Sequence, residues 1–125
     1  RLPTLKLAYS EGQIGWIPYI LERADNVWEE NRAWGGFGEN VPEPPSTYYY
    51  RQIYGCFFDD KYGLDNLEKV GVDNICFETD YPHSDSTWPH SKEVAEKLMG
   101  HLPEDVIYKL MRGNAIEMLG LDFDK

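Results

Sequence analysis

Three short strand-like runs divide this chain, at residues 5–10, 53–58 and 74–79. The last two hold the continuously apolar stretches Tyr54–Phe58 and Ile75–Phe77. Such stretches are typical of strands in a parallel sheet, because helices cover both faces of that sheet. The pattern therefore predicts three strands, with segments of a different period between them.

Helical periodicity follows the first strand. Apolar side chains recur there at intervals of three and four residues and define one face of a helix: Ile14, Ile17, Leu21, Ala24 and Trp28. Pro18 fits this helix only in its first turn. A loop rich in glycine and proline extends from Trp34 to Pro45, and loops of this length are usually functional or mobile.

Helices are also predicted after this loop and after each later strand. Ser46 is expected to cap a short helix through Tyr50. A helix at 63–70 is expected to end at Gly71, and C-terminal helices are expected at 89–99, 103–111 and 114–119. The alternation of strand and helix predicts an α/β fold in which residues 1–125 form a single partial domain.

Charge narrows the range of partners. The 125 residues include 22 acidic and 12 basic side chains, for a net charge of −10, and the basic residues are scattered. A protein of this charge repels nucleic-acid phosphates and anionic lipids. No apolar run reaches the roughly 20 residues that cross a bilayer. We therefore expect a small-molecule substrate and neither a nucleic-acid nor a membrane partner.

The two cysteines lie inside strand-like runs, away from other ligands. Cys56 and Cys76 are not at metal-ligand spacing from a histidine or a second cysteine. We expect both to be buried, reduced thiols, as in a cytoplasmic protein.

Acidic residues follow all three predicted strands, at Glu11, Asp59–Asp60 and Asp80. The carboxyl ends of parallel strands share one edge, so these acids are expected to converge where they can bind a metal or move protons. Asp80 is the best candidate for a metal ligand, and it could equally take a proton from an activated water. The alternative is that Asp80 caps the turn around Pro82 or pairs with a cation.

Two further residues are candidates for catalysis. His83 could bind substrate or shuttle protons, or could be a hydrogen-bonded bystander. Glu11 could be a general base or an acid that favours the start of the following helix. If Asp80 points to the inner face of the sheet, away from the helices, then Glu78 does too, while Phe77 faces the helices. Glu78 would then need a polar partner.

Aromatic side chains near the presumed active edge are candidates for substrate contacts. Trp16, Trp34 and Trp88 lie in or beside loops and helix starts, and Tyr81 follows Asp80 directly. They could form walls for a planar substrate, although ordinary packing is the more common role of such residues. We predict Trp16, Tyr81 and Trp88 as substrate-binding residues.

Residues Thr79–His83, directly after an apolar strand, resemble the eighth-strand motif of the amidohydrolase-related barrels, which include hydrolases and non-oxidative decarboxylases. The longer run 80–89 is similar to that of a bacterial subgroup of predicted metal-dependent hydrolases. Ser10–Pro18 resembles the end of that subgroup's sixth strand, and Arg112–Ala115 resembles the "GNA" element of the family's last helix. The resemblance implies the C-terminal part of a (β/α)₈ barrel, about strands 6–8 and their helices.

The same resemblance implies a chemistry. Asp80 matches the aspartate that ligates a divalent metal, zinc or alternatively manganese, or relays protons. The reaction would be hydrolysis, or decarboxylation of an aromatic or enoic acid. Glu11 stands where the decarboxylases often carry a histidine, and the family's other metal ligands are histidines of the first and fifth strands. This chain of 125 residues lacks those strands, so we expect it to be inactive alone.

A three-strand sheet also has two open edges, which favour pairing with another chain. We therefore expect a homo-oligomer or pairing with the missing barrel portion. The competing hypothesis is a non-catalytic barrel fragment that acts as a scaffold or interaction subunit, in line with the absent metal ligands.

Overall fold

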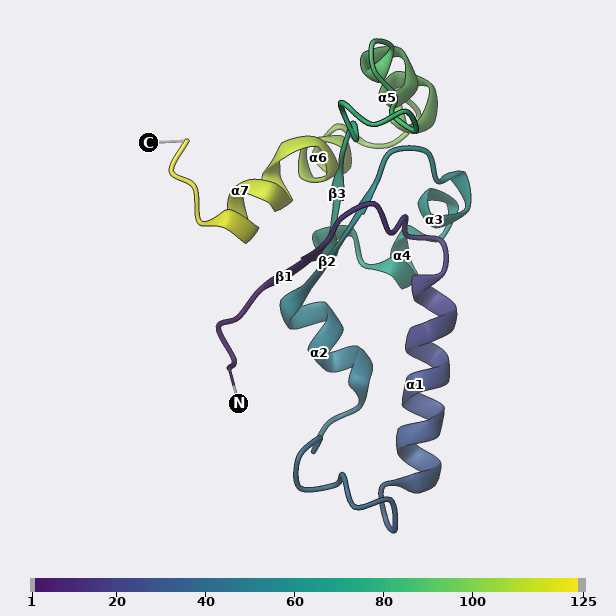
Figure 1. The fold of residues 1–125 in the computed structure, drawn as a ribbon, viewed down its shortest axis with the longest axis vertical. Coiled ribbons are helices and arrows are strands. Elements are labelled where there is room, and N and C mark those ends of the chain that lie inside the picture. The colour runs from purple at the N-terminus through teal and green to yellow at the C-terminus, as the bar shows by residue number, and fades with distance from the viewer. Residues whose placement is uncertain (1, 124–125) are drawn as a thin grey trace.

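The computed structural model describes residues 2–123 and contains a three-stranded parallel sheet with helices on both faces (Figure 1). The strands are β1 (Leu7–Tyr9), β2 (Ile53–Phe57) and β3 (Ile75–Phe77), and they lie side by side in chain order. Tyr9 pairs with Gly55, which in turn pairs with Ile75. The predicted α/β fold and all three predicted strands are confirmed, although each strand is shorter than the segment predicted for it.

The helices follow the predicted order. They are α1 (Ile17–Asn31), α2 (Pro45–Gln52), α3 (Lys61–Asp65), α4 (Leu67–Val70), the 3₁₀ turn η1 (Val72–Asn74), α5 (Ser91–Met99), α6 (Glu104–Tyr108), the π-helical turn η2 (Lys109–Gly113) and α7 (Asn114–Leu119). The helix predicted at 63–70 is interrupted at Asn66, so the prediction of one continuous helix was wrong. Asn66 leaves the helical conformation, with φ −120° and ψ 29°, while its side chain donates to the Tyr62 carbonyl.

The helix ends show which local signals were correct. Pro18 lies in the first turn of α1, as predicted. Gly71 and Gly120 end their helices with φ values of 93° and 63°, a conformation that glycine adopts at little cost. Ser46 does not cap α2, because the helix begins one residue earlier at Pro45. The ring of Pro45 fixes a helical φ and suits the first position of a helix.

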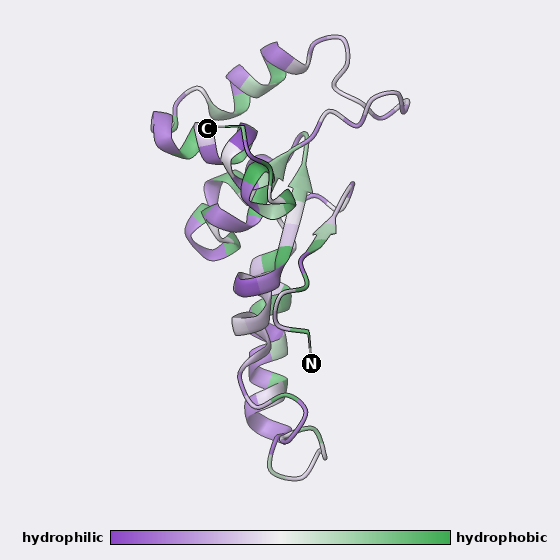
Figure 2. Cartoon of the chain, turned by 90° about the vertical axis from the view of Figure 1, so that its left-hand side faces the viewer, coloured by the Kyte–Doolittle hydropathy of each residue, from purple (hydrophilic) through white to green (hydrophobic). Residues whose placement is uncertain are grey.

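The main core lies between the sheet and the helices of one face. Strand residues Phe57 and Ile75 are fully buried there against Ile14 and Ile17. A β-carbon at Gly55 would come within 3.1 Å of both isoleucines, so glycine allows the start of α1 to approach the sheet closely. Hydrophilic and hydrophobic residues alternate along the helices (Figure 2), and among residues 2–123 no helix has the length and apolarity that crossing a membrane requires.

The opposite face of the sheet carries a smaller apolar cluster. Tyr54, Cys56 and Cys76 are buried there and pack against Ala115 and Met118. Both cysteines are unpaired thiols, as predicted. Burial raises the pKa of Cys76 to about 12 and also raises the pKa of Cys56.

β1 forms an exposed edge of the sheet within the described residues. Leu5, Leu7 and Tyr9 are 55%, 53% and 52% exposed, whereas residues 54–57 of β2 are buried. Apolar side chains on an unpaired strand edge are a site at which further chain can add.

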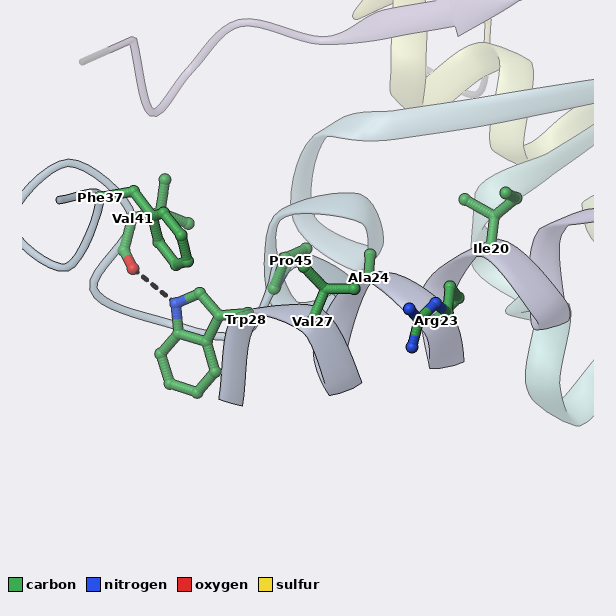
Figure 3. A pocket seen from close by; sticks show the side chains of 8 residues that line it. All are labelled: Ile20, Arg23, Ala24, Val27, Trp28, Phe37, Val41 and Pro45. Atoms are coloured by element: carbon green, nitrogen blue, oxygen red, sulfur yellow. Dashed lines mark hydrogen bonds between the residues drawn. The ribbon is translucent and has the colours of Figure 1, made fainter. Parts of the chain in front are cut away.

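The long loop after α1 folds back along that helix. Trp28 donates its indole N–H to the Val41 carbonyl at 2.8 Å. An open apolar groove of about 380 Å³ lies between the helix and the loop (Figure 3), lined by Ile20, Arg23, Ala24, Val27, Trp28, Phe37, Val41 and Pro45. This groove is formed by the side of α1, away from the carboxyl ends of the strands (Figure 1).

Candidate active site

Three predicted site residues meet at the carboxyl edge of the sheet. Glu11 follows β1, and Asp80 and His83 follow β3. One side-chain oxygen or nitrogen from each residue lies within 4.8 Å of those from the other two. The expected convergence therefore occurs, although the acids after β2 take no part in it.

Asp80 lies at the inner side of this cluster. Its side chain is only 10% exposed, and its Oδ1 lies 2.9 Å from Nδ1 of His83. The backbone of Asp80 is left-handed, with φ 55°, and a hydrogen bond from the His83 N–H to the Asp80 carbonyl closes the turn at 2.9 Å. Non-glycine residues in this conformation are uncommon, aspartate adopts it more readily than most, and strained backbones of this kind cluster at functional sites. The turn brings the imidazole back over the carboxylate.

Glu11 completes the cluster from the other side. Its Oε1 lies 3.5 Å from Nδ1 of His83, and the two side chains are 57% and 59% exposed. Like Asp80, Glu11 has a left-handed backbone, with φ 58°. The cluster is therefore closed at Asp80 and open to solvent at Glu11 and His83.

Glu78 supports this arrangement from beneath. Its Oε1 accepts the backbone N–H of Glu11 at 2.7 Å, which is the polar partner that an inward Glu78 was expected to need. Phe77 lies on the other face and packs edge-to-face on Phe57, as alternation predicts. Burial raises the pKa of Glu78; the Glu11 N–H opposes that rise, and the charges of Asp80 and Glu11 add to it.

The acids after β2 have a different role from the one predicted. The Oδ2 atom of Asp60 accepts the N–H groups of Ile14 and Gly15 at 2.7 and 2.6 Å, and Oδ1 accepts that of Gly63 at 2.8 Å. Asp60 thus caps α3 and holds the turn before α1. Asp59 is exposed. The prediction that both would join the cluster was wrong, because backbone donors already occupy the Asp60 carboxylate.

The three aromatic residues predicted to bind substrate are exposed beside this edge. Tyr81 and Trp88 are each 63% exposed, and their rings contact edge-to-face at 5.3 Å. Trp16 is 43% exposed and donates its indole N–H to the Gly12 carbonyl at 2.7 Å. All three rings therefore offer apolar surface to a ligand.

Trp34 was expected at the active edge, and this was wrong. It is 76% exposed and follows the last turn of α1. The 15 residues of α1 extend over roughly 22 Å at about 1.5 Å per residue. Because α1 starts at the carboxyl edge and runs away from it (Figure 1), Trp34 lies at the opposite end of the molecule.

The donor set suits a divalent cation. Carboxylate oxygens and an imidazole nitrogen are ligands of both zinc and manganese, and Glu11, Asp80 and His83 supply them from two strand ends. The same geometry also permits a metal-free pair in which His83 donates its Nδ1 proton to Asp80, leaving Nε2 as a base.

Comparison with known proteins gives consistent results. A family model described as "Amidohydrolase" matches residues 1–121. The crystal structure of an amidohydrolase from Mycobacterium avium subsp. paratuberculosis superposes with a TM-score of 0.76 at 24% identity, over 94% of this chain and 29% of that one. The crystal structure of 5-carboxyvanillate decarboxylase LigW from Sphingomonas paucimobilis superposes with a TM-score of 0.66 at 23% identity, over 86% of this chain and 31% of that one. No curated protein sequence matches. The chain spans less than a third of either structure, and at these identities the likeness concerns the fold.

Proposed function

This chain belongs to the amidohydrolase family, and on that basis we propose that it supplies part of the active site of a metal-dependent hydrolase acting on a small molecule. The observation that carries the proposal is the meeting of Glu11, Asp80 and His83 at the carboxyl edge of a parallel sheet. We infer that β1, β2 and β3 are strands 6, 7 and 8 of a (β/α)₈ barrel, and the motif Thr79–His83 directly after the third strand run supports this order.

Members of the family generally bind divalent metals. Asp80 and Glu11 would hold zinc or manganese here through carboxylate oxygens, with His83 beside them as the base, and other strands of the barrel would complete the set of ligands. A divalent ion supplies positive charge that polarises a substrate oxygen and lowers the pKa of water toward neutrality.

The residues of this chain have distinct tasks in the proposed reaction. The nearly buried Asp80 orients the imidazole of His83 through the 2.9 Å contact at Nδ1. With its proton on Nδ1, His83 carries a lone pair on Nε2 that can accept a proton from water or substrate. Glu11 adds a second carboxylate on the solvent side. Trp16, Tyr81 and Trp88 would contact the apolar part of the substrate.

Decarboxylation is the second candidate, because one structural neighbour is a decarboxylase. That reaction needs a cationic group to hold the substrate carboxylate. Arg51 precedes β2 and pairs with Glu43, so it does not serve the carboxyl edge. We therefore propose hydrolysis as the main reaction. Loss of CO₂ would require a cation from another part of the barrel.

Assembly is part of the proposal. The exposed apolar edge of β1 would pair with the preceding barrel strand or with a second copy of the chain. The competing function, a non-catalytic scaffold, would use the same edge without a metal.

Elemental analysis of the complete protein, with the remaining barrel strands present, tests the metal centre. We expect about one zinc or manganese ion per chain in the wild type and a loss of most of it in Asp80→Ala. Asp59→Ala is the matched control, because Asp59 is an exposed acid that follows β2, and it should retain the metal. A wild-type protein that takes up neither ion, even after incubation with both, would eliminate the catalytic proposal in favour of the scaffold.

A further inference from the structure

We propose that Glu78 is a positioning residue of this site, and that its carboxylate holds the backbone of Glu11 so that the Glu11 side chain faces Asp80 and His83. The inference rests on the proposed function, because that function gives Glu11 a place in the metal centre. Glu78 itself lies outside the three-residue group and would act through Glu11.

The turn that carries Glu11 is one that needs support. Glu11 and Gln13 both have left-handed backbones, with φ values of 58° and 53°. Non-glycine residues adopt this conformation at a cost and keep it where the surrounding structure holds them. The Glu11 side chain is itself more than half exposed, so packing around that side chain does not fix the turn.

Carboxylates of two other segments hold the two ends of this turn. Glu78 accepts the N–H of Glu11 at the start. Asp60 accepts the N–H groups of Ile14 and Gly15 at the end. The residue whose backbone Glu78 holds is therefore also the residue that provides a side chain to the cluster, whereas Asp60 holds the entry to α1.

Glu78 is well placed for this task. Its own backbone N–H donates to the Phe57 carbonyl at 2.8 Å, which extends the β2–β3 pairing by one residue. Its side chain is half-buried and close to the negative charges of Asp80 and Glu11, an unfavourable setting for a third carboxylate. The hydrogen bond from the Glu11 N–H to the Glu78 carboxylate offsets part of this unfavourable setting. Hydrogen bonds to ionised groups are stronger than neutral ones, so a carboxylate suits the position.

Two substitutions, made in the complete protein with its remaining barrel strands, separate positioning from charge. Glu78→Ala removes the acceptor, whereas Glu78→Gln keeps an amide oxygen that can accept the same N–H. We expect Glu78→Ala to weaken Mn²⁺ binding by about tenfold, the lower end of the effect of residues that orient ligands. Glu78→Gln should bind Mn²⁺ with an affinity close to that of the wild type. Calorimetric titration with Mn²⁺ measures both, and urea unfolding confirms that each variant is folded.

A double-mutant cycle tests whether Glu78 acts through Glu11. In a Glu11→Ala background, Glu78→Ala should produce no further loss of Mn²⁺ affinity, because the side chain that it positions is already gone. A further loss of similar size, or equal losses for Glu78→Ala and Glu78→Gln, would overturn the inference and indicate a direct effect of charge.

Amide-resolved hydrogen exchange gives a readout that does not depend on metal. Glu78→Ala should speed exchange at the Glu11 amide and leave those of Ile14 and Gly15 unchanged. Unchanged exchange at Glu11 would refute the positioning role even if the metal centre exists. If the wild type binds neither Mn²⁺ nor Zn²⁺, the proposed function fails, and the exchange experiment still decides whether Glu78 holds the turn.

Discussion

Replacing Asp60 by asparagine changes one atom of the group that fixes the entry to α1. In the wild type both carboxylate oxygens accept backbone N–H groups, two at Oδ2 and one at Oδ1. An asparagine has only one acceptor oxygen, and its NH₂ group donates. In either orientation of the amide, the NH₂ group therefore faces at least one backbone N–H.

The least disruptive orientation loses the bond from Gly63 and keeps those from Ile14 and Gly15. A hydrogen bond to an ionised group contributes about 1.5–3 kcal/mol, and a neutral one about 1 kcal/mol. The loss of one charged bond and the weakening of two give an expected destabilisation of about 3 kcal/mol. The opposite orientation loses two bonds and costs more.

Urea unfolding of the full chain, followed by circular dichroism, measures this difference. Asp59→Asn provides the control, because Asp59 is the adjacent acid and is exposed; it should change stability by less than about 0.5 kcal/mol. If Asp60→Asn is as stable as Asp59→Asn, the three bonds do not stabilise the fold, and the account of the turn before α1 is wrong.

Two further predictions concern the thiols and the aromatic residues. Burial raises the pKa of Cys76 from 9.0 to about 12, so the thiol ionises at lower pH in the unfolded chain than in the folded one. The contribution of the buried thiol to folding stability is therefore complete below pH 9 and is lost as pH rises toward 12. Over this range the stability of the wild type to urea should fall more than that of Cys76→Ala, and equal falls would contradict the burial argument. Trp88→Ala should raise KM for the substrate severalfold with little change in stability, since Trp88 is 63% exposed. Trp34→Ala, at the far end of α1, is the control and should leave KM unchanged. Equal effects on KM would count against a substrate-binding role for Trp88.

The sequence predicted the cluster because its geometry follows from local rules. Glu11 and Asp80 come two and three residues after the ends of β1 and β3, and parallel strands end at one edge, so no long-range detail was needed to expect them together. His83 is three residues beyond Asp80, and one turn of the backbone brings it back. The predicted end of the last helix at Leu119 was also correct, because a helix end depends on the backbone freedom of a single following residue, here Gly120.

The errors concern residues whose roles depend on distant parts of the chain. Asp60 binds backbone groups 45 and 46 positions earlier, and no local pattern reveals which N–H groups the fold places beside it. Its cap on α3 was visible in principle, as an aspartate before a short helix. Trp34 was misplaced because its end of the molecule depends on the uninterrupted length of α1.

The order of the strands limits which side chains can serve the site. Glu11 comes from β1, Asp80 and His83 come from β3, and β2 separates the two. Neighbouring strands lie about 4.8 Å apart, so the backbones of β1 and β3 are roughly 10 Å apart. Side chains must span this gap, and glutamate is one methylene longer than aspartate. At position 11 the reach of the side chain is therefore as important as its charge, and an aspartate there would keep the charge while falling short of His83.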